Sequence, residues 1–547
     1  MINNKSTIRM DSYKLKSFNK SRVFFAGLTL LLCFGCTKNF RDYNTNPNNA
    51  TAQELQYDNL STGVFFSEME QNIFPTAQEP AFGDEMYQEV QNLCGDIYSG
   101  YMGASDDWFG GVNSTNYAMT PSWYGQAFGR AFLSVMPAWL SIKKVTQGNA
   151  STQHIYALAQ IIKVESISRT TDIYGPLPYT QFGSGSLTTA YDPQSAIYYS
   201  FFNDLDSAIA TLTTYVTDNP GSMPLANYDL IYAGDYTKWI KFANSLKLRL
   251  AMRLAYVDAA SAQKYAEAAV NNSYGVFTTA GDDALLQSAD GINIHNPLQI
   301  ICYNFNDIRM GANMESFLTG YKDPRLPFMF NKAVTDNKYH GIRNGISITS
   351  QSLYTDPFST LNVAPTTPIR WMSAPEMFFL RAEGALRGWN MAGTPQSLYE
   401  TGIQASFDQW GAGSAASYIV DSVDKAAAYT DPSVNSNSVS SGLSTITVHW
   451  KASDPMETQL ERIITQKWIA VYPDGQEAWT EFRRTAYPRI FPVAVNNSAG
   501  LINSSTQIRR LPFPQSEYQS NASGVATGVS ELGGGDNGGT KLWWDKK

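Results

Sequence analysis

The chain has 547 residues, of which 43% are hydrophobic and 16% are charged. It carries 40 Lys and Arg against 48 Asp and Glu, a formal net charge of -8. Phosphate backbones are bound by basic patches, so nucleic acid is excluded as the expected partner.

Residues 1–35 have the pattern of a secretory signal peptide. Four basic residues precede an uncharged apolar stretch over 23–35: Lys14, Lys16, Lys20 and Arg22. This stretch is shorter than the ~20 apolar residues that span a membrane, so it predicts a signal that is removed. A small residue, Gly35, precedes Cys36, which favours cleavage there and acyl chains on Cys36. The alternative is an ordinary secretory signal with an incidental cysteine.

Two further regions follow Cys36. Residues 36–50 are polar and rich in Asn, which predicts a flexible tether. Residues 51–547 show no break in composition, so we expect a single large globular body. Its two cysteines, Cys94 and Cys302, allow one disulfide or two separate buried thiols, and the sequence leaves both possibilities open.

Helical patterns dominate this body, because apolar residues recur there every three or four positions. The predicted helices are 153–170, 193–215, 236–256, 261–271, 375–389, 395–410, 457–472 and 475–485. Neighbouring helices are joined by short turns, as in stacked hairpins of the tetratricopeptide type. We expect a mostly α fold with long irregular loops and a few short strands.

Five long segments are predicted not to be helical: 95–124, 278–306, 323–368, 431–453 and 488–547. Loops of this length in a compact protein usually carry function. We therefore expect the binding site to lie in one or more of them.

Catalytic motifs are missing from the sequence. The four histidines have no pair at the spacing of a zinc hydrolase helix, and no serine elbow or phosphate-binding loop is present. Asp106 and Asp107 could belong to a glycosidase, but carboxylate pairs are common on an acidic surface. We predict that the chain is not an enzyme and needs no metal or cofactor.

The segment 98–124 has an unusual composition. It combines aromatic residues with Asp, Asn and Gly, and aromatic faces with neighbouring polar groups suit sugar rings. The predicted ligand-binding residues are Tyr101, Asp107, Trp108, Asn113, Trp123 and Tyr124. The alternative is a loop that packs its aromatic residues against the helical body.

Several stretches in one order resemble a known family. Residues 463–485, with Gln466-Lys467-Trp468 and Phe482-Arg483-Arg484-Thr485, are similar to the signature of SusD/RagB outer-membrane lipoproteins. Further matching stretches are 40–47, 169–181 (RTTDIYGPLPYTQ), 239–253 (WIKFANSLKLRLAMR), 376–384 (EMFFLRAEG), 399–407 (YETGIQASF), 509–518 (RRLPFPQSEY) and 543–545.

The resemblance implies four helix hairpins of the tetratricopeptide type and a lipid anchor in the outer membrane, with the body facing outside. It also implies non-catalytic binding of a nutrient glycan and delivery to a SusC-like TonB-dependent transporter. Motif residues such as Arg381, Glu383, Trp479 and Arg484 are expected to be structural. The ligand-binding residues above are inferred from composition alone.

Three other functions stay open at this stage. A relative of the same family could bind peptides, a helical-repeat scaffold could bind proteins, and a surface glycosidase could cleave glycans. The identity of the glycan and the presence of a calcium ion are not predicted.

Overall fold

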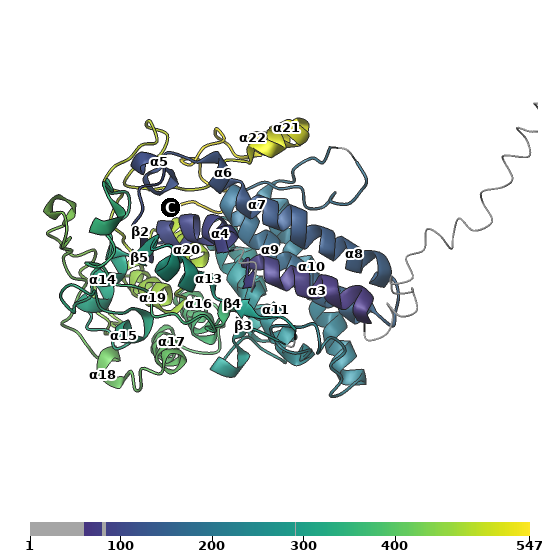
Figure 1. Ribbon diagram of the computed structural model, residues 1–547. Helices are drawn as coiled ribbons and strands as arrows, with labels where there is room; N and C mark the ends of the chain where they lie inside the picture. Colours follow the sequence, from purple (N-terminus) through teal and green to yellow (C-terminus); the bar gives the residue numbers. More distant parts are fainter. Residues whose placement is uncertain (1–58, 79–83, 187, 290) are drawn as a thin grey trace, which may run out of the picture. The chain divides into compact units, whose positions relative to one another are not determined.

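The structure is a computed structural model that describes residues 59–78, 84–186, 188–289 and 291–547 (Figure 1). Residues 61–547 form one compact unit, and the other unit is residues 1–60. The predicted signal peptide, the lipidated Cys36 and the tether over 36–50 lie outside the described residues. So does the predicted start of the body at residue 51.

Helices are the main secondary structure of the described chain, as the sequence predicts. The first half contains α3 (Leu60–Ile73), α4 (Asp84–Tyr87), α5 (Trp108–Gly111), α6 (Pro121–Tyr124), α7 (Gln126–Arg130), α8 (Met136–Thr146), α9 (Gln153–Tyr174), α10 (Gln194–Asp218), α11 (Tyr236–Arg253) and α12 (Ala259–Val270). The second half contains α13 (Pro297–Gln299), α14 (Ala312–Gly320), α15 (Leu326–Met329), α16 (Ala374–Leu386), α17 (Pro395–Trp410), α18 (Ala416–Ile419), α19 (Met456–Ala470), α20 (Gly475–Thr485), α21 (Gln515–Ser520) and α22 (Ala522–Glu531).

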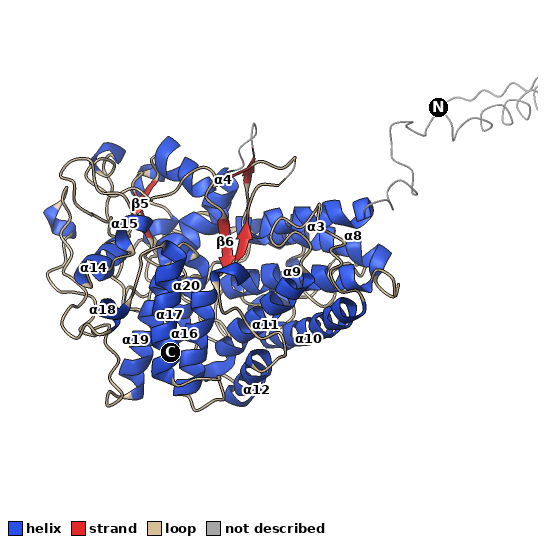
Figure 2. Cartoon of the chain, turned by 90° about the horizontal axis from the view of Figure 1, so that it is seen from below, coloured by secondary structure: helices blue, strands red, loops and turns tan. Residues whose placement is uncertain are grey.

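The long helices form two groups (Figures 1 and 2). Helices α8, α9, α10, α11 and α12 pack in sequence order as neighbours, and α16 packs against α17 and α19 in the second group. Helix α11 contacts α16, and α9 contacts α20, so the two groups share one core. In the described part of the chain, no helix is both long and apolar enough to cross a membrane.

Within the described ranges, six short strands form three antiparallel pairs. β1 (Ala77–Gln78) pairs with β4 (Ile294–His295), β2 (Met102–Ala104) with β5 (Ile308–Met310), and β3 (Ala284–Leu286) with β6 (Ile369–Met372). Each pair joins segments far apart in the sequence, so the strands fix the long loops against the helical body.

Helix α17 shows why several predicted boundaries are accurate. Thr394 accepts a hydrogen bond from the backbone of Ser397, Pro395 occupies the first turn, and Gly411 ends the helix with φ 67°. A Thr cap, a Pro at the start and a left-handed Gly at the end are the signals that define helix ends. The helix therefore covers 395–410, as predicted.

Helix α22 was missed, because 488–547 was predicted not to be helical. Its two glycines lower the intrinsic helix propensity, but both make close contacts. A Cβ on Gly528 would lie 2.6 Å from the Tyr191 ring, and one on Gly524 would lie 2.2 Å from the Thr189 carbonyl oxygen. Tertiary packing that requires glycine therefore outweighs local propensity here.

Charged side chains are buried where the two helix groups meet. Arg249 of α11 donates to both carboxylate oxygens of Glu376 in α16, at 2.9 and 2.6 Å. Lys467 of α19 donates to Glu477 of α20 at 2.7 Å, and Arg253 of α11 also binds Glu477. A buried charge is tolerated when it is paired in this way.

The two cysteines of the body are separate thiols. Cys94 and Cys302 are both free and buried. The structure thus favours the second of the two possibilities that the sequence left open.

Candidate functional site

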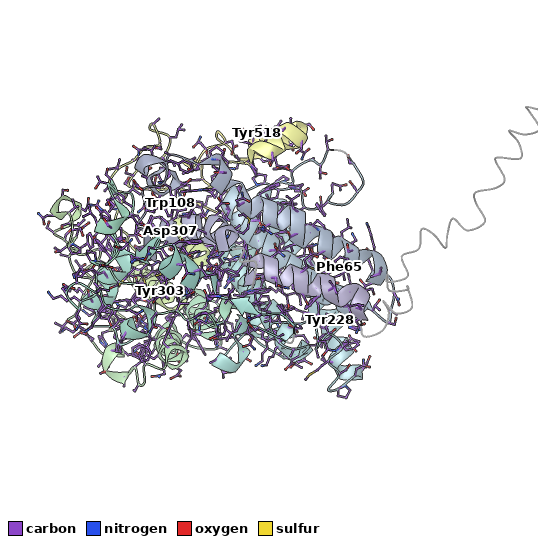
Figure 3. The ribbon with its side chains drawn as sticks, viewed as in Figure 1. Phe65, Trp108, Tyr228, Tyr303, Asp307 and Tyr518 are labelled. Carbon is purple, nitrogen blue, oxygen red and sulfur yellow. The ribbon has the colours of Figure 1, made fainter. Side chains whose placement is uncertain are left out.

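The pairing of β2 with β5 brings two predicted loop segments together. Ala104 at the end of β2 lies opposite Ile308 at the start of β5. Because the strands are antiparallel, the residues after β2 lie beside the residues before β5. The backbone N–H of Ser105 donates to the carbonyl of Asp307 at 2.9 Å. Figure 3 labels Trp108 and Asp307 in the same region of the view.

Three aromatic rings gather on the first loop, and we call Trp108, Phe109 and Trp123 the aromatic platform. The ring centroids of Trp108 and Trp123 lie 5.5 Å apart at 89°, and those of Phe109 and Trp123 lie 5.7 Å apart at 50°. Phe109 is 65% exposed, Trp108 is half-buried, and Trp123 is buried beneath them. The platform thus offers two accessible rings on a buried support.

The backbone holds Phe109 outward in an unusual conformation. Phe109 has φ 55° and ψ 34°, and Gly110 and Gly111 follow with φ of 66° and 76°. A left-handed conformation costs a non-glycine residue roughly 1–2 kcal/mol. Such strain is concentrated at functional sites, where the surrounding structure holds the residue in place. An exposed phenylalanine in a strained turn therefore marks this loop as a candidate site.

Asn113 maintains the shape of the loop. Its side-chain amide donates to the Trp108 carbonyl at 2.9 Å, and its side-chain oxygen accepts from the backbone of Thr115 at 2.9 Å. The residue is 2% exposed. Both polar groups of Asn113 are thus used within the loop, and its contact with a ligand stays a prediction.

Tyr101 and Tyr124 differ from the prediction. Tyr101 is 0% exposed, packs 4.9 Å from the ring of Trp468, and donates its hydroxyl to the Trp468 carbonyl. Tyr124 is buried, and its hydroxyl accepts from the side chain of Gln515 at 3.2 Å. Both tyrosines belong to the packing of the body and present no open ring face to a ligand. Asp107 is exposed beside the platform, and its role, like that of Trp108 and Trp123, stays a prediction.

Asp307 provides a carboxylate next to the platform. Its Oδ2 accepts from the side-chain amide of Gln88 at 2.7 Å. Burial raises the pKa of Asp307 to about 6. The hydrogen bond from Gln88 lowers this pKa, and the charge of Asp106 raises it. Asp307 was not predicted as a site residue.

Tyr303 and Phe305 extend the aromatic surface along the second loop. They are 38% and 42% exposed. The hydroxyl of Tyr303 donates to the Leu361 carbonyl and accepts from the side-chain amide of Asn331 at 2.9 Å, which fixes the ring. Figure 3 shows Tyr303 and Asp307 on the same side of the molecule.

A third loop completes this surface. The side-chain amide of Gln351 donates to the carbonyl of Phe305 at 3.1 Å and approaches Asp307 Oδ1 at 3.5 Å. Three loops from distant parts of the sequence thus form one surface, the aromatic face, made of the platform, Tyr303, Phe305, Asp307 and Gln351. The Tyr-Asn-Phe-Asn-Asp run over 303–307 has the composition that singled out 98–124, and it was the signal that could have identified the second loop.

The remaining motif residues are structural, as the resemblance implies. Glu383, Trp468, Trp479, Arg483 and Arg484 are each 0–1% exposed, and Arg381 is 9% exposed. Across the described residues, no group of three or more His, Cys, Asp or Glu is placed to hold a metal ion.

Comparison with known proteins assigns the chain to a family. A profile described as "SusD-like: Susd and RagB outer membrane lipoprotein" matches residues 42–545. The chain belongs to this SusD-like family. Curated proteins give no match. The family consists of non-catalytic, glycan-binding lipoproteins of the outer membrane, which confirms the predicted localisation and the absence of enzymatic activity.

Solved structures show the same fold. A chitin-binding SusD homolog from Flavobacterium johnsoniae is 43% identical, with a TM-score of 0.85 over 89% of this chain and 99% of that one. SusD homologs from Bacteroides vulgatus and Bacteroides uniformis are 35% and 37% identical, with TM-scores of 0.85 and 0.83. They cover 90% and 89% of this chain and 99% of theirs. The predicted mostly α, SusD-like fold is therefore confirmed.

Proposed function

We propose that this SusD-like lipoprotein captures a nutrient glycan on its aromatic face and passes it to a SusC-like TonB-dependent transporter. The observation that carries the proposal is the pair of accessible rings, Trp108 and Phe109, with the exposed carboxylate of Asp107 beside them. A sugar presents apolar C–H faces and polar hydroxyl edges, and this surface offers partners for both.

Each part of the face has a distinct role in this proposal. Trp108 and Phe109 stack against consecutive sugar rings, while Trp123 keeps them in place from below. Asp107, exposed beside the platform, accepts a hydrogen bond from a hydroxyl or amide N–H of the glycan. Asp307 is buried and holds the loops together through Gln88 and Gln351. Tyr303 and Phe305 extend the contact to further sugar units along the same surface.

The chitin-binding relative suggests which glycans to test first. At 43% identity, the Flavobacterium protein supports oligomers of N-acetylglucosamine as the leading class. The acetamido group combines an apolar methyl with an N–H donor, which suits rings next to an acceptor carboxylate. Peptide binding, the nearest rival function, would instead require an open groove with free backbone groups.

Delivery to a transporter rests on the family and on the predicted lipid anchor. Acyl chains on Cys36 would hold the protein at the membrane, and a tether over 36–50 would let the body move over its partner. Co-purification from detergent-solubilised outer membranes, with an affinity tag on this chain, is expected to recover a TonB-dependent barrel.

Calorimetric titration of the soluble body, residues 47–547, tests the glycan proposal. Chitin oligosaccharides are compared with cello- and malto-oligosaccharides of equal length. Trp108→Ala is expected to weaken binding about tenfold, because it removes one stacking ring worth on the order of 1 kcal/mol or more. Tyr518→Ala is the matched control, since Tyr518 is 40% exposed and lies apart from the aromatic face (Figure 3).

Binding to one glycan class without release of smaller sugars, weakened only by Trp108→Ala, would support the proposal. Failure of every glycan, with binding of peptides instead, would refute the glycan assignment and leave the family membership unaffected. Equal loss of affinity in both variants would refute the location of the site.

A further inference from the structure

A cavity separate from the aromatic face lies beside β6, and no residue of the aromatic face lines it. It is a cavity of about 120 Å³ between the end of α17 and the turn that joins α19 to α20. Most of its wall is hydrocarbon or aromatic, with Phe74, Leu298, Leu361, Ile369 and Tyr472 among the lining residues. Figure 2 shows β6 near the middle of the body, between the two helix groups.

Arg370 of β6 brings a positive charge to this apolar wall. Its Nε is buried and has no hydrogen-bond partner, and its Nη1 reaches only the Tyr472 carbonyl, at 3.5 Å. Among the described residues, no carboxylate lies within ion-pair distance of Arg370. By contrast, the guanidinium of Arg325 is held by Asp323 at 2.6 Å. Burial accordingly lowers the pKa of Arg370.

A guanidinium does not lose its proton in proteins, so Arg370 keeps its charge. A buried charge without a partner is costly, and proteins normally pair it with an anion. Arg370 is half-buried, and the charge of Asp283 acts on it without forming an ion pair, so no carboxylate binds the guanidinium directly.

Trp410 supplies a second free donor at the same wall. Its indole N–H is buried without an acceptor, and the Arg370 guanidinium lies 5.4 Å from the Trp410 ring centroid. Asp474, which also lines the cavity, is already bound by Arg169 at 2.9 Å. Asp283 accepts from the backbone of Ala374 at 2.8 Å. The Nε of Arg370 and the indole N–H of Trp410 are thus two buried donors without an acceptor at this wall.

We infer that this cavity binds a small monocarboxylate with an apolar body, of about the size of benzoate. The carboxylate would lie on the donors of Arg370 and Trp410, and the body would lie against Phe74, Leu298 and Tyr472. An engineered cavity of about 150 Å³ in another protein holds benzene. A cavity of about 120 Å³ therefore suits a short branched chain, or a ring whose carboxylate lies at the half-exposed Arg370. Sugars are excluded, since most of their hydroxyls would be buried against hydrocarbon without partners.

Fluorine NMR of 4-fluorobenzoate, added to residues 47–547, tests this inference directly. The neutral isostere 4-fluorobenzamide is the ligand control, because it keeps the ring and removes the charge. The acid is expected to bind at least about tenfold more tightly than the amide, as charge-assisted hydrogen bonds contribute about 1.5–3 kcal/mol. This comparison needs no variant, so it does not depend on a mutant that folds.

Two variants identify the donors. Arg370→Met removes the charge and keeps the length of the side chain. It is expected to lower the affinity for the acid at least about tenfold and to change the affinity for the amide little. Trp410→Phe keeps a ring and removes the N–H, and it is expected to lower the affinity for the acid several-fold. Arg489→Met is the matched control, since the Arg489 side chain is 63% exposed and lies outside the cavity lining.

Equal affinity for acid and amide would overturn the inference. So would unchanged affinity in folded Arg370→Met, or the absence of binding by 4-fluorobenzoate, hexanoate and isovalerate at millimolar concentration. Because glycan titration reports on a different surface, failure of this inference is distinguishable from failure of the proposed function.

Discussion

Arg484 donates to both carboxylate oxygens of Glu383, at 2.7 and 2.5 Å, across 101 residues of sequence. Both side chains are 0% exposed. Although burial opposes ionisation, the charge and hydrogen bonds of Arg484 hold the pKa of Glu383 below its usual range. The pair joins α20 to α16, and it unites two stretches by which the family was recognised.

Arg484→Met is expected to lower the free energy of unfolding by about 3–5 kcal/mol, because it leaves Glu383 buried without its main partner. Chemical denaturation of residues 47–547 measures the loss. The control is Lys322→Met at the exposed pair with Asp424, where the Lys322 side chain is 75% exposed and a much smaller loss is expected. Similar losses in the two variants would contradict a special role for the buried pair.

The helical framework was predictable because local signals and tertiary packing agree there. Asp235 caps α11 by accepting from the backbone of Thr237 at 3.0 Å, and Trp239 in the predicted helix 236–256 is buried in the core. Helix α22 was not predictable, since the closest contacts of its glycines are with Thr189 and Tyr191, more than 300 positions away.

Phe109→Gly separates binding from stability. Glycine adopts φ 55° without strain, so the lost ring contact with Trp123 is offset, and the free energy of unfolding is expected to change by less than about 1 kcal/mol. Glycan affinity is expected to fall several-fold, because one of the two accessible rings is gone. Calorimetry and chemical denaturation on the same sample check both statements. Unchanged affinity would place the glycan elsewhere.

Asp307 predicts a pH dependence of stability. An unfolded aspartate has a pKa of about 4, whereas the pKa of Asp307 is raised to about 6, mainly by burial. Between these values the folded state holds a proton that the unfolded state has released. This contribution to stability is therefore present below about pH 4 and is lost as the pH rises through about 6.

Compared with Asp307→Asn, the wild-type protein is expected to lose on the order of 1–3 kcal/mol between pH 4 and pH 7. Urea denaturation of both proteins at pH 4, 5 and 7 measures this difference, with Asp218→Asn treated identically as an exposed control. A difference that stays constant, or that grows in the opposite direction, would show that Asp307 is not desolvated in the folded state.

The candidate site was predictable only in part, because composition identifies a segment but does not show which of its side chains face the surface and which face the core. Trp108 and Tyr101 lie seven positions apart in the same aromatic segment, yet one ring is half-buried beside the loop surface and the other is in the core. Whether a ring lies at the surface or in the core depends on the pairing of β2 with β5, and the residues of β5 lie more than 200 positions later in the sequence. Asp307 and Tyr303 were missed for the same reason, since nothing local shows that their loop lies beside Trp108.

Cys94 and Cys302 are expected to behave as two buried, unreactive thiols. Burial raises the pKa of Cys94 to about 12 and raises that of Cys302 as well, so little of the reactive thiolate forms at neutral pH. Residues 47–547 should bind no alkylating reagent while folded and two equivalents after denaturation without reductant, as counted by intact mass. The thermal midpoint should also be the same with and without reductant. A requirement for reductant before alkylation would instead demonstrate a disulfide and a different arrangement of the loop that contains Cys302.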